Sequence, residues 1–109
     1  MLFRLFAYSN NRDEAKFVFN SVIKNIESSI VYKEYKKIEP YWKIDGIYVV
    51  EVKVEFYKGF YEKNKEEFLK SIADKWTVSG NPIQEIIASD TTEGCMYIKK
   101  GIKMINIFY

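Results

Sequence analysis

Residues 45 to 57, DGIYVVEVKVEFY, contain the stretch that decides the fold. Apolar side chains recur in it at every second position, at Tyr48, Val50, Val52, Val54 and Phe56. Glu51, Lys53 and Glu55 lie between them, and this period of two predicts a strand with one face on a core and the other in water. Asp45-Gly46, directly before the strand, favours a type I′ hairpin turn, because Asp and Gly tolerate the positive φ that such a turn needs.

The residues before this strand predict a first strand, a helix and an edge strand. Residues 2 to 8, LFRLFAY, are rich in apolar and aromatic side chains and are typical of a buried strand. Asn11 and Glu14 have the spacing of a capping box, so we expect a helix from there to about Ser28. Residues 30 to 38, IVYKEYKKI, predict an edge strand, where lysines discourage unwanted pairing. The apolar stripe of the helix comprises Ala15, Val18, Phe19, Val22, Ile23 and Ile26.

The residues after it predict a second helix and a β-rich tail. Asn64 and Glu67 repeat the capping-box spacing, and Gly80 ends the pattern. Residues 84 to 89 and 95 to 109 favour two further strands, joined by a turn and bent near a glycine. The apolar face of the second helix comprises Phe68, Leu69, Ile72, Ala73 and Trp76.

The order of these elements is β, α, β, β, α and then β-rich. We therefore predict a single α+β domain over residues 1–109: a ferredoxin-like split βαβ, with an antiparallel sheet, two helices on one face and an extended C-terminal hairpin. The other sheet face stays open. We expect it to carry Glu51, Lys53 and Glu55 from the central strand, and Lys33, Tyr35 and Lys37 from its neighbour.

Composition points away from catalysis and from membranes. The 109 residues include no histidine and one cysteine, Cys95, which removes the usual general base, the usual activator of a nucleophile and the commonest zinc ligand. We therefore expect no enzyme activity, no cofactor and no metal. The formal net charge is only +2, which makes nucleic acid an unfavoured partner. The apolar runs are too short for a membrane span or a signal peptide, so we expect a cytoplasmic protein.

An aromatic cluster before the Asp-Gly turn is the strongest candidate for a contact surface. In EPYWKIDG, residues 39 to 46, we expect Pro40 to interrupt ladder pairing, so the segment should lie at a sheet edge or in a hairpin arm. Tyr41 and Trp42 are adjacent, so at most one of them can face a core beneath the helices. One hypothesis is that the outward ring anchors a partner, since Trp and Tyr are common binding hot spots. The alternative is structural, with Trp42 packed inward and Tyr41 covering a loop.

The chain resembles the small bacterial immunity proteins of contact-dependent growth inhibition and other polymorphic toxin systems. The resemblance is general: the length, a composition rich in Lys, Ile, Asn, Tyr and Glu, and charged and aromatic residues spread over an α+β domain. It implies a tight one-to-one complex that blocks the active site of a cognate toxin, commonly a nuclease. For such a basic partner, the candidate contact carboxylates are Glu39, Asp45, Glu51 and Glu55.

Two other functions remain open at this point. One is a small ligand-sensing or dimerising domain, in which the open sheet face is the dimer surface. The other is an RNA-binding module, since residues 32 to 37 and 97 to 103 place lysines beside tyrosines. Acidic residues interrupt that face, and no aromatic RNA-binding signature is present. The sequence leaves the oligomeric state open.

Overall fold

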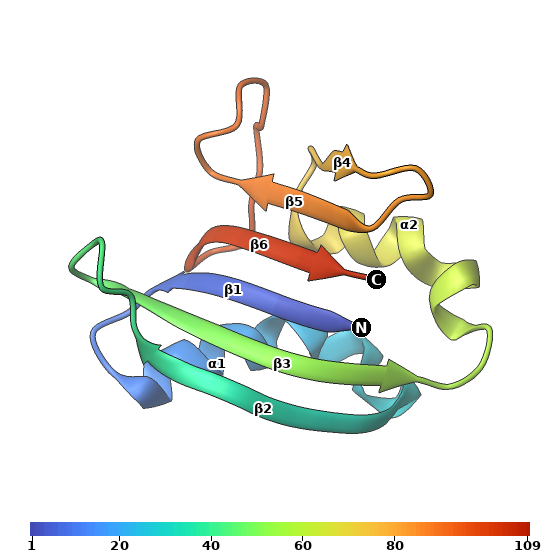
Figure 1. Cartoon of the computed structure of the whole chain (residues 1–109), viewed down its shortest axis with the longest axis horizontal. Coiled ribbons are helices and arrows are strands. Elements are labelled where there is room, and N and C mark those ends of the chain that lie inside the picture. Colours follow the sequence, from blue (N-terminus) through green and yellow to red (C-terminus); the bar gives the residue numbers. More distant parts are fainter.

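The alternating stretch forms β3 (Ile47–Phe56), which lies between β1 (Leu2–Tyr8) and β2 (Ile30–Pro40) in a six-stranded antiparallel sheet (Figure 1). The computed structural model describes all of residues 1–109. The remaining elements are α1 (Arg12–Ile23), the 3₁₀ helix η1 (Lys24–Ser29), α2 (Phe60–Ile72), β4 (Thr77–Ser79), β5 (Glu85–Ser89) and β6 (Ile102–Phe108).

The strands lie in the order β2-β3-β1-β6-β5-β4. The α+β class and the antiparallel sheet are confirmed, and so is the position of β2 at an edge. Because β5 and β4 extend the sheet beyond β6, the order is not clearly ferredoxin-like. The Cα radius of gyration is 13.4 Å, close to the roughly 13 Å of a compact domain of about this length.

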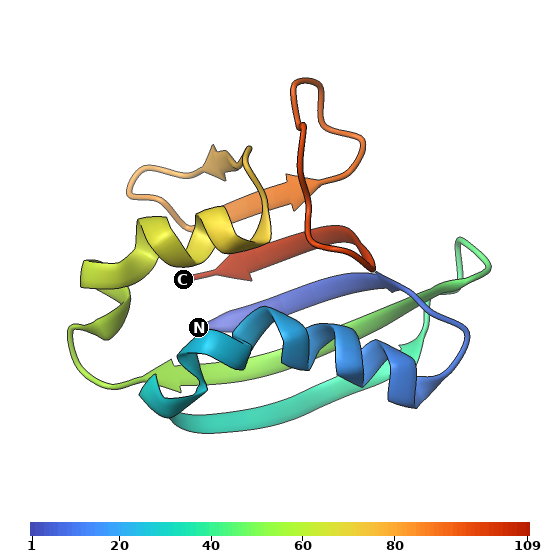
Figure 2. The same cartoon turned by 180° about the vertical axis from the view of Figure 1, so that it is seen from behind.

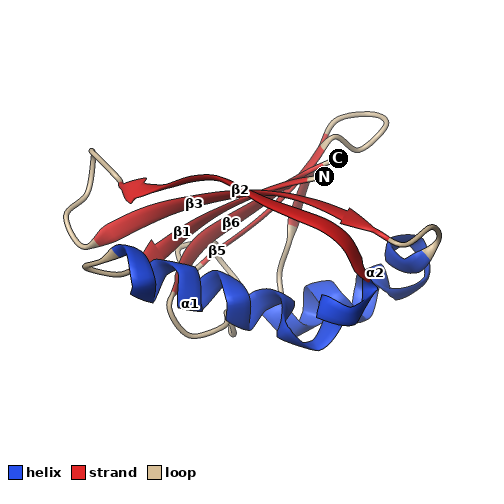
Figure 3. Ribbon diagram, turned by 90° about the horizontal axis from the view of Figure 1, so that it is seen from below, coloured by secondary structure: helices blue, strands red, loops and turns tan.

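Both helices lie on the same side of the sheet, as Figure 3 shows from its edge and Figure 2 from behind. Asn11 caps α1 as predicted: its side chain accepts a hydrogen bond from the Glu14 backbone N–H at 2.8 Å. The stripe on α1 then faces the sheet, with Phe19 and Ile23 fully buried. On β3, Val50, Val52 and Val54 are also fully buried, so the period of two assigned the core face correctly.

Three aromatic rings join the two helices to the sheet. Phe3 on β1 is fully buried, and its ring centroid lies 6.1 Å from that of Phe19 on α1 and 6.1 Å from that of Phe68 on α2. The strand β1 is therefore covered on this side by both helices.

The second helix departs from its predicted boundaries. It begins at Phe60, after Gly59 in the left-handed conformation (φ 82°), and no side chain caps it. Asn64 lies inside the helix, where its amide donates a hydrogen bond to the Phe60 carbonyl at 2.9 Å. The helix ends at Ile72, so Trp76 lies beyond it, although the indole ring packs back against the core.

The hairpin before β3 is also different from the prediction. Its loop runs from residue 41 to residue 46, and the Tyr41 N–H donates to the Ile47 carbonyl at 2.8 Å. Only glycines have positive φ in this chain, so Asp45 does not meet the requirement of a type I′ turn. Pro40 pairs with Tyr48, which means that the ladder continues through the proline on the edge strand.

Register shifts in β2 correct the predicted open face. One shift lies between Tyr35 and Lys37. Tyr35 pairs with the buried Val52 and packs on the helix side, where its ring meets Phe19 at 5.9 Å. Lys37 pairs with Glu51 and lies on the open face as expected, whereas Lys33 pairs with the buried Val54. A bulge reverses the alternation that a sequence pattern assumes.

The tail forms β5 and β6, which pair antiparallel from Glu85–Phe108 to Ser89–Met104. Residues 95 to 101 were predicted as part of the last strand, and this was wrong: they belong to the long connection between β5 and β6. The sequence pattern also missed β4, whose three residues are all exposed. No helix combines the length and the hydropathy needed to cross a membrane.

Candidate interaction surface

Several charges on the sheet face without helices are paired within the chain, although Lys53 and Glu55 form no ion pair. Arg4 on β1 lies opposite Glu51 on β3, and the Arg4 Nε to Glu51 Oε2 distance is 2.6 Å. The same guanidinium lies over the Phe108 ring, 5.1 Å from its centroid. Only 16% of the Glu51 side chain is exposed, so this carboxylate is held against the sheet and is neutralised by its partner.

The edge strand adds two further ion pairs. Lys37 Nζ lies 3.7 Å from Glu39 Oε1, and Lys36 Nζ lies 3.1 Å from Glu34 Oε1. Hydrogen bonds from the Tyr32 hydroxyl and from Lys36 lower the pKa of Glu34. Because positive and negative groups alternate along this edge, it presents no field of a single sign.

The loop between β2 and β3 places one aromatic ring on the sheet and the next in solvent. The Tyr41 ring packs edge-on against Phe6 of β1, with centroids 5.1 Å apart. Trp42 is 83% exposed, and its ring meets Tyr41 at 6.3 Å and the Lys43 ammonium at 5.0 Å. Ile44 is exposed on the same loop. The structural alternative, in which Trp42 packs inward, is therefore wrong, and neither ring lies beneath the helices.

The loop and the sheet enclose a shallow hollow of about 280 Å³, which we call the Phe6 hollow. Phe6 and Val49 belong to its apolar part, and Arg4 and Glu51 to its charged part. The other lining residues are Lys37, Glu39, Pro40, Tyr41 and Trp42.

Four of the six predicted contact residues, Glu39, Tyr41, Trp42 and Glu51, thus line one hollow. Asp45 is exposed on the adjoining loop, and Glu55 is exposed near the far end of β3. Neither of these two carboxylates has an ion-pair partner, in contrast to Glu39 and Glu51. About ten residues separate them along a strand, roughly 30 Å at about 3.3 Å per residue, so they do not share one small contact patch.

Arg4 and Phe6 were missed as members of this surface. The composition of residues 2 to 8 predicts a buried strand, but the strand alternates between buried Phe3, Leu5 and Ala7 and partly exposed Arg4 and Phe6. The available signal was the charged Arg4 directly between Phe3 and Leu5, because neighbouring strand residues point to opposite faces.

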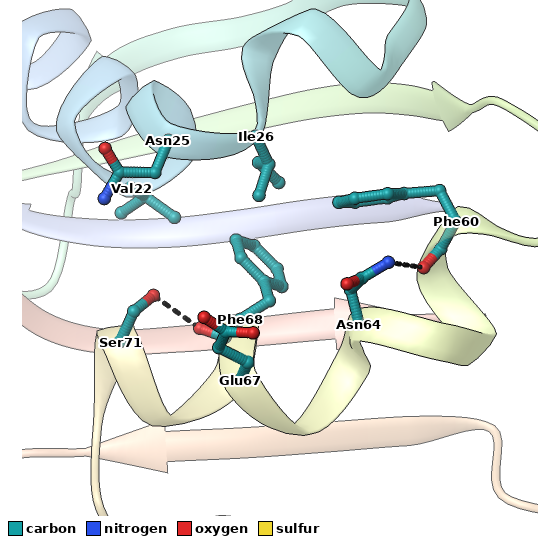
Figure 4. Close-up of a pocket in the computed structure, with 8 residues that line it drawn as sticks. All are labelled: Val22, Asn25, Ile26, Phe60, Asn64, Glu67, Phe68 and Ser71. Atoms are coloured by element: carbon teal, nitrogen blue, oxygen red, sulfur yellow. Dashed lines mark hydrogen bonds between the residues drawn. The ribbon is translucent and has the colours of Figure 1, made fainter.

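A second cavity lies on the opposite side of the molecule, between η1 and α2 (Figure 4). It measures about 210 Å³, which is below the roughly 300 Å³ at which ligand pockets usually begin. Phe68, Phe60 and Ile26 supply apolar walls, while the Asn64 amide and the Ser71 hydroxyl are hydrogen-bonded to backbone carbonyls of α2. Two of its four polar lining side chains are therefore engaged within α2, and Asn25 and Glu67 are the other two.

Cys95 lies outside both cavities. Its thiol donates a hydrogen bond to Asp74 Oδ1 at 3.5 Å, and desolvation together with this contact raises the pKa of the thiol. The protonated form is favoured, which is the opposite of what an activated nucleophile needs. No family model matches the chain, and no curated protein or solved structure is detectably similar to it.

Proposed function

We propose that the chain is a cytoplasmic immunity protein that binds a cognate bacterial toxin, a nuclease, in a one-to-one complex and blocks its active site without catalysis of its own. One observation carries the proposal: Trp42 is 83% exposed on a loop that is supported by Tyr41 and Phe6. An exposed indole on a fixed base is suited to fill a pocket of another protein, because little conformational entropy remains to be lost on binding.

The charges around Trp42 refine the expected contact. Arg4 neutralises Glu51, and Lys37 neutralises Glu39, so these carboxylates shape the hollow rather than attract a basic partner. Asp45 is unpaired and lies three residues from Trp42 in the same loop. We propose that Asp45 is the carboxylate that meets a basic group of the toxin, and that Glu55 lies outside the central contact.

In fold, we propose that β2-β3-β1-β6 with α1 and α2 is a ferredoxin-like split βαβ core. Three features support this: the four strands are consecutive in the sheet, they pair antiparallel, and both helices cover one face. The strands β5 and β4 would then be additions to the outer edge of β6, with β5 and β6 as the extended C-terminal hairpin.

The experiment starts from the neighbouring reading frame. The reading frame directly upstream is cloned, and its product is expressed with and without this chain; the proposal expects a large toxin there. Growth should be restored only in the presence of the chain, and the two proteins should elute together at a one-to-one ratio. Trp42→Ala should leave unfolding unchanged and weaken the complex by about 2 kcal/mol or more, roughly thirtyfold in Kd.

Met96→Ala is the matched control, because Met96 is 87% exposed on a different loop and should not affect binding. Equal affinities of both variants would refute the role of Trp42. The immunity function would be refuted if the chain neither restored growth nor formed a complex with the neighbouring toxin. Turnover of RNA, a nucleotide or an ester that is lost on a single carboxylate substitution would refute the absence of catalysis.

A dimerising domain is the second candidate, because Leu2, Phe6 and Phe108 leave partly exposed apolar surface on the helix-free face. A metabolic operon around the gene, together with self-association that Trp42→Ala or Phe6→Ser abolishes, would favour it. An RNA-binding module has less support, since carboxylates alternate with the lysines and the arginine of the open face and leave phosphate no continuous basic surface.

A further inference from the structure

The outer side of α1 carries a surface that the proposed function does not use. A groove of about 630 Å³ separates the N-terminal half of α1 from the turn that precedes β6. We call it the α1 groove and define it by Asp13, Glu14, Phe17, Val18, Lys99 and Lys100. Its volume exceeds those of the Phe6 hollow and of the cavity between η1 and α2, and it lies on the helix side.

The shape of the α1 groove is fixed by a close approach of the turn to the helix. Gly101 has a φ of +91°, and a Cβ at this position would lie 3.0 Å from the Val18 Cγ2 atom. Only glycine combines this conformation with this contact. The Tyr8 hydroxyl also donates a hydrogen bond to Asp90, which ties the end of β1 to the connection after β5.

Phe17 is the unusual residue of the groove. It lies off the apolar stripe of α1 and is 74% exposed, at a helix position where a polar residue is the norm. A single exposed ring is unremarkable, but this one borders a groove whose floor contains Val18. The ring therefore forms an apolar projection directly beside an apolar recess.

The charged walls of the α1 groove are opposite in sign and unpaired. Asp13 and Glu14 belong to the first turn of α1, while Lys99 and Lys100 belong to the turn before β6. None of the four forms an ion pair within 4.0 Å. The neighbouring cations are occupied elsewhere, because Arg12 donates to the Ile38 carbonyl and Lys16 lies over the Tyr35 ring.

We infer that the α1 groove binds a second copy of this chain through a two-fold symmetric contact. In such a contact residue i meets residue j while j meets i, so one patch must be complementary to itself. The α1 groove meets this condition: the acidic wall of one copy can face the basic wall of the other, twice, and each Phe17 can enter the recess of its partner. A nucleic acid or an anionic surface would instead require an excess of positive charge.

The wild-type chain is tested by sedimentation velocity from about 1 to 500 μM. A contact smaller than a standard interface is expected to have a Kd above about 1 μM, so a reversible dimer should form within this range. Phe17→Ser should raise the dimer Kd at least tenfold. Tyr57→Ser is the matched control, since Tyr57 is 59% exposed and lies outside the α1 groove.

A charge exchange tests the geometry itself. Variant A combines Asp13→Lys with Glu14→Gln, and variant B combines Lys99→Glu with Lys100→Glu. Each variant alone has walls of one sign and should stay monomeric. An equimolar mixture should form a heterodimer, because both contacts then join opposite charges. Circular dichroism checks that A and B remain folded.

A monomeric wild type at 500 μM would overturn the inference. So would a dimer with an unchanged Kd in Phe17→Ser, or a mixture of folded A and B that fails to associate. These outcomes are independent of toxin binding, because Phe17→Ser leaves Trp42 and its hollow intact.

Discussion

Asp74 organises the irregular connection before β6 with one exposed carboxylate. It accepts hydrogen bonds from the backbone N–H groups of Met96 and Tyr97, each at 3.1 Å, and from the Cys95 thiol. These bonds, that from Tyr97 foremost, lower the pKa of Asp74. A carboxylate with a lower pKa in the folded state stabilises that state above the unfolded pKa of about 3.9. This contribution is lost as the pH falls through the folded value.

We therefore predict that Asp74→Asn unfolds at lower urea than the wild type at pH 7, and that the difference narrows as the pH falls below about 4. Urea titrations at several pH values from 7 to 2 measure it. Asp45→Asn is the control, because Asp45 is exposed and has no ion-pair partner; its curve should run parallel to the wild type. A constant gap between Asp74→Asn and the wild type at all pH values would contradict the prediction.

Single residues also show what a sequence pattern can and cannot predict. The alternation of β3 was enough to place Val50 and Val52 in the core. The same rule failed for Lys33 and Tyr35, because the bulge before Lys37 moves the strand by one residue and a sequence pattern does not contain the partner strand. The exposure of Trp42 could not be predicted from the sequence either, since it depends on the Tyr41 ring packing against Phe6.

At the scale of elements, the C-terminal end of α2 is completed by a residue that lies outside the helix. The Trp76 indole N–H donates to the carbonyls of Leu69 and Ala73, at 3.0 and 3.2 Å. The Leu69 carbonyl also accepts a hydrogen bond from the Ala73 N–H, so the indole adds a second bond there and supplies a partner to the Ala73 carbonyl just beyond the helix. The apolar periodicity predicted Trp76 as part of the helix. Trp76 lies beyond the helix end, but its ring packs against the same core as the apolar face of α2.

We predict that Trp76→Phe lowers the free energy of unfolding by about 1 to 2 kcal/mol, because a ring remains but the hydrogen bonds are lost. Relative to the wild type, Trp76→Phe should accelerate amide hydrogen exchange more in the last turn of α2 than in β3. The control is Trp42→Phe, whose free energy of unfolding should stay within about 0.5 kcal/mol of the wild type. Equal stability of both variants would contradict a capping role for Trp76.

The capping boxes illustrate why one helix start was predicted and the other was not. Asn11 and Glu14 follow a strand and precede the stripe, and the structure confirms Asn11 as the cap. Asn64 and Glu67 have the same spacing, but Phe60 and Tyr61 already belong to the helix because their rings pack against Phe56 of β3. Tertiary contacts extended this helix beyond its local signal.

For the whole molecule, the sequence predicted the class and the central strands but not the full sheet. The order of strong patterns gave the α+β class and the edge position of β2. The number of strands depends on β4, which forms through long-range pairing with β5. The late start of β6 depends on the Asp74 contacts with the preceding connection. Neither follows from local periodicity. The sequence predicted the loop residues of the Phe6 hollow. Arg4 and Phe6 could not be assigned to it without knowing that β1 pairs with β3.

Phe3 offers a test of whether the sheet and both helices unfold together, as a single domain over residues 1–109 would. Its buried ring contacts Phe19 and Phe68, so Phe3→Leu removes ring contacts to both helices at once. We predict a loss of about 1 to 3 kcal/mol in the free energy of unfolding, against less than about 0.5 kcal/mol for Phe17→Leu on the exposed side of α1. In a Trp42→Phe background, far-ultraviolet circular dichroism and Trp76 fluorescence should report the same urea midpoint, lowered equally by Phe3→Leu. Separate midpoints for the two probes would show that α2 and the sheet unfold independently, because Trp76 reports on the end of α2 while the dichroism reports on the whole chain.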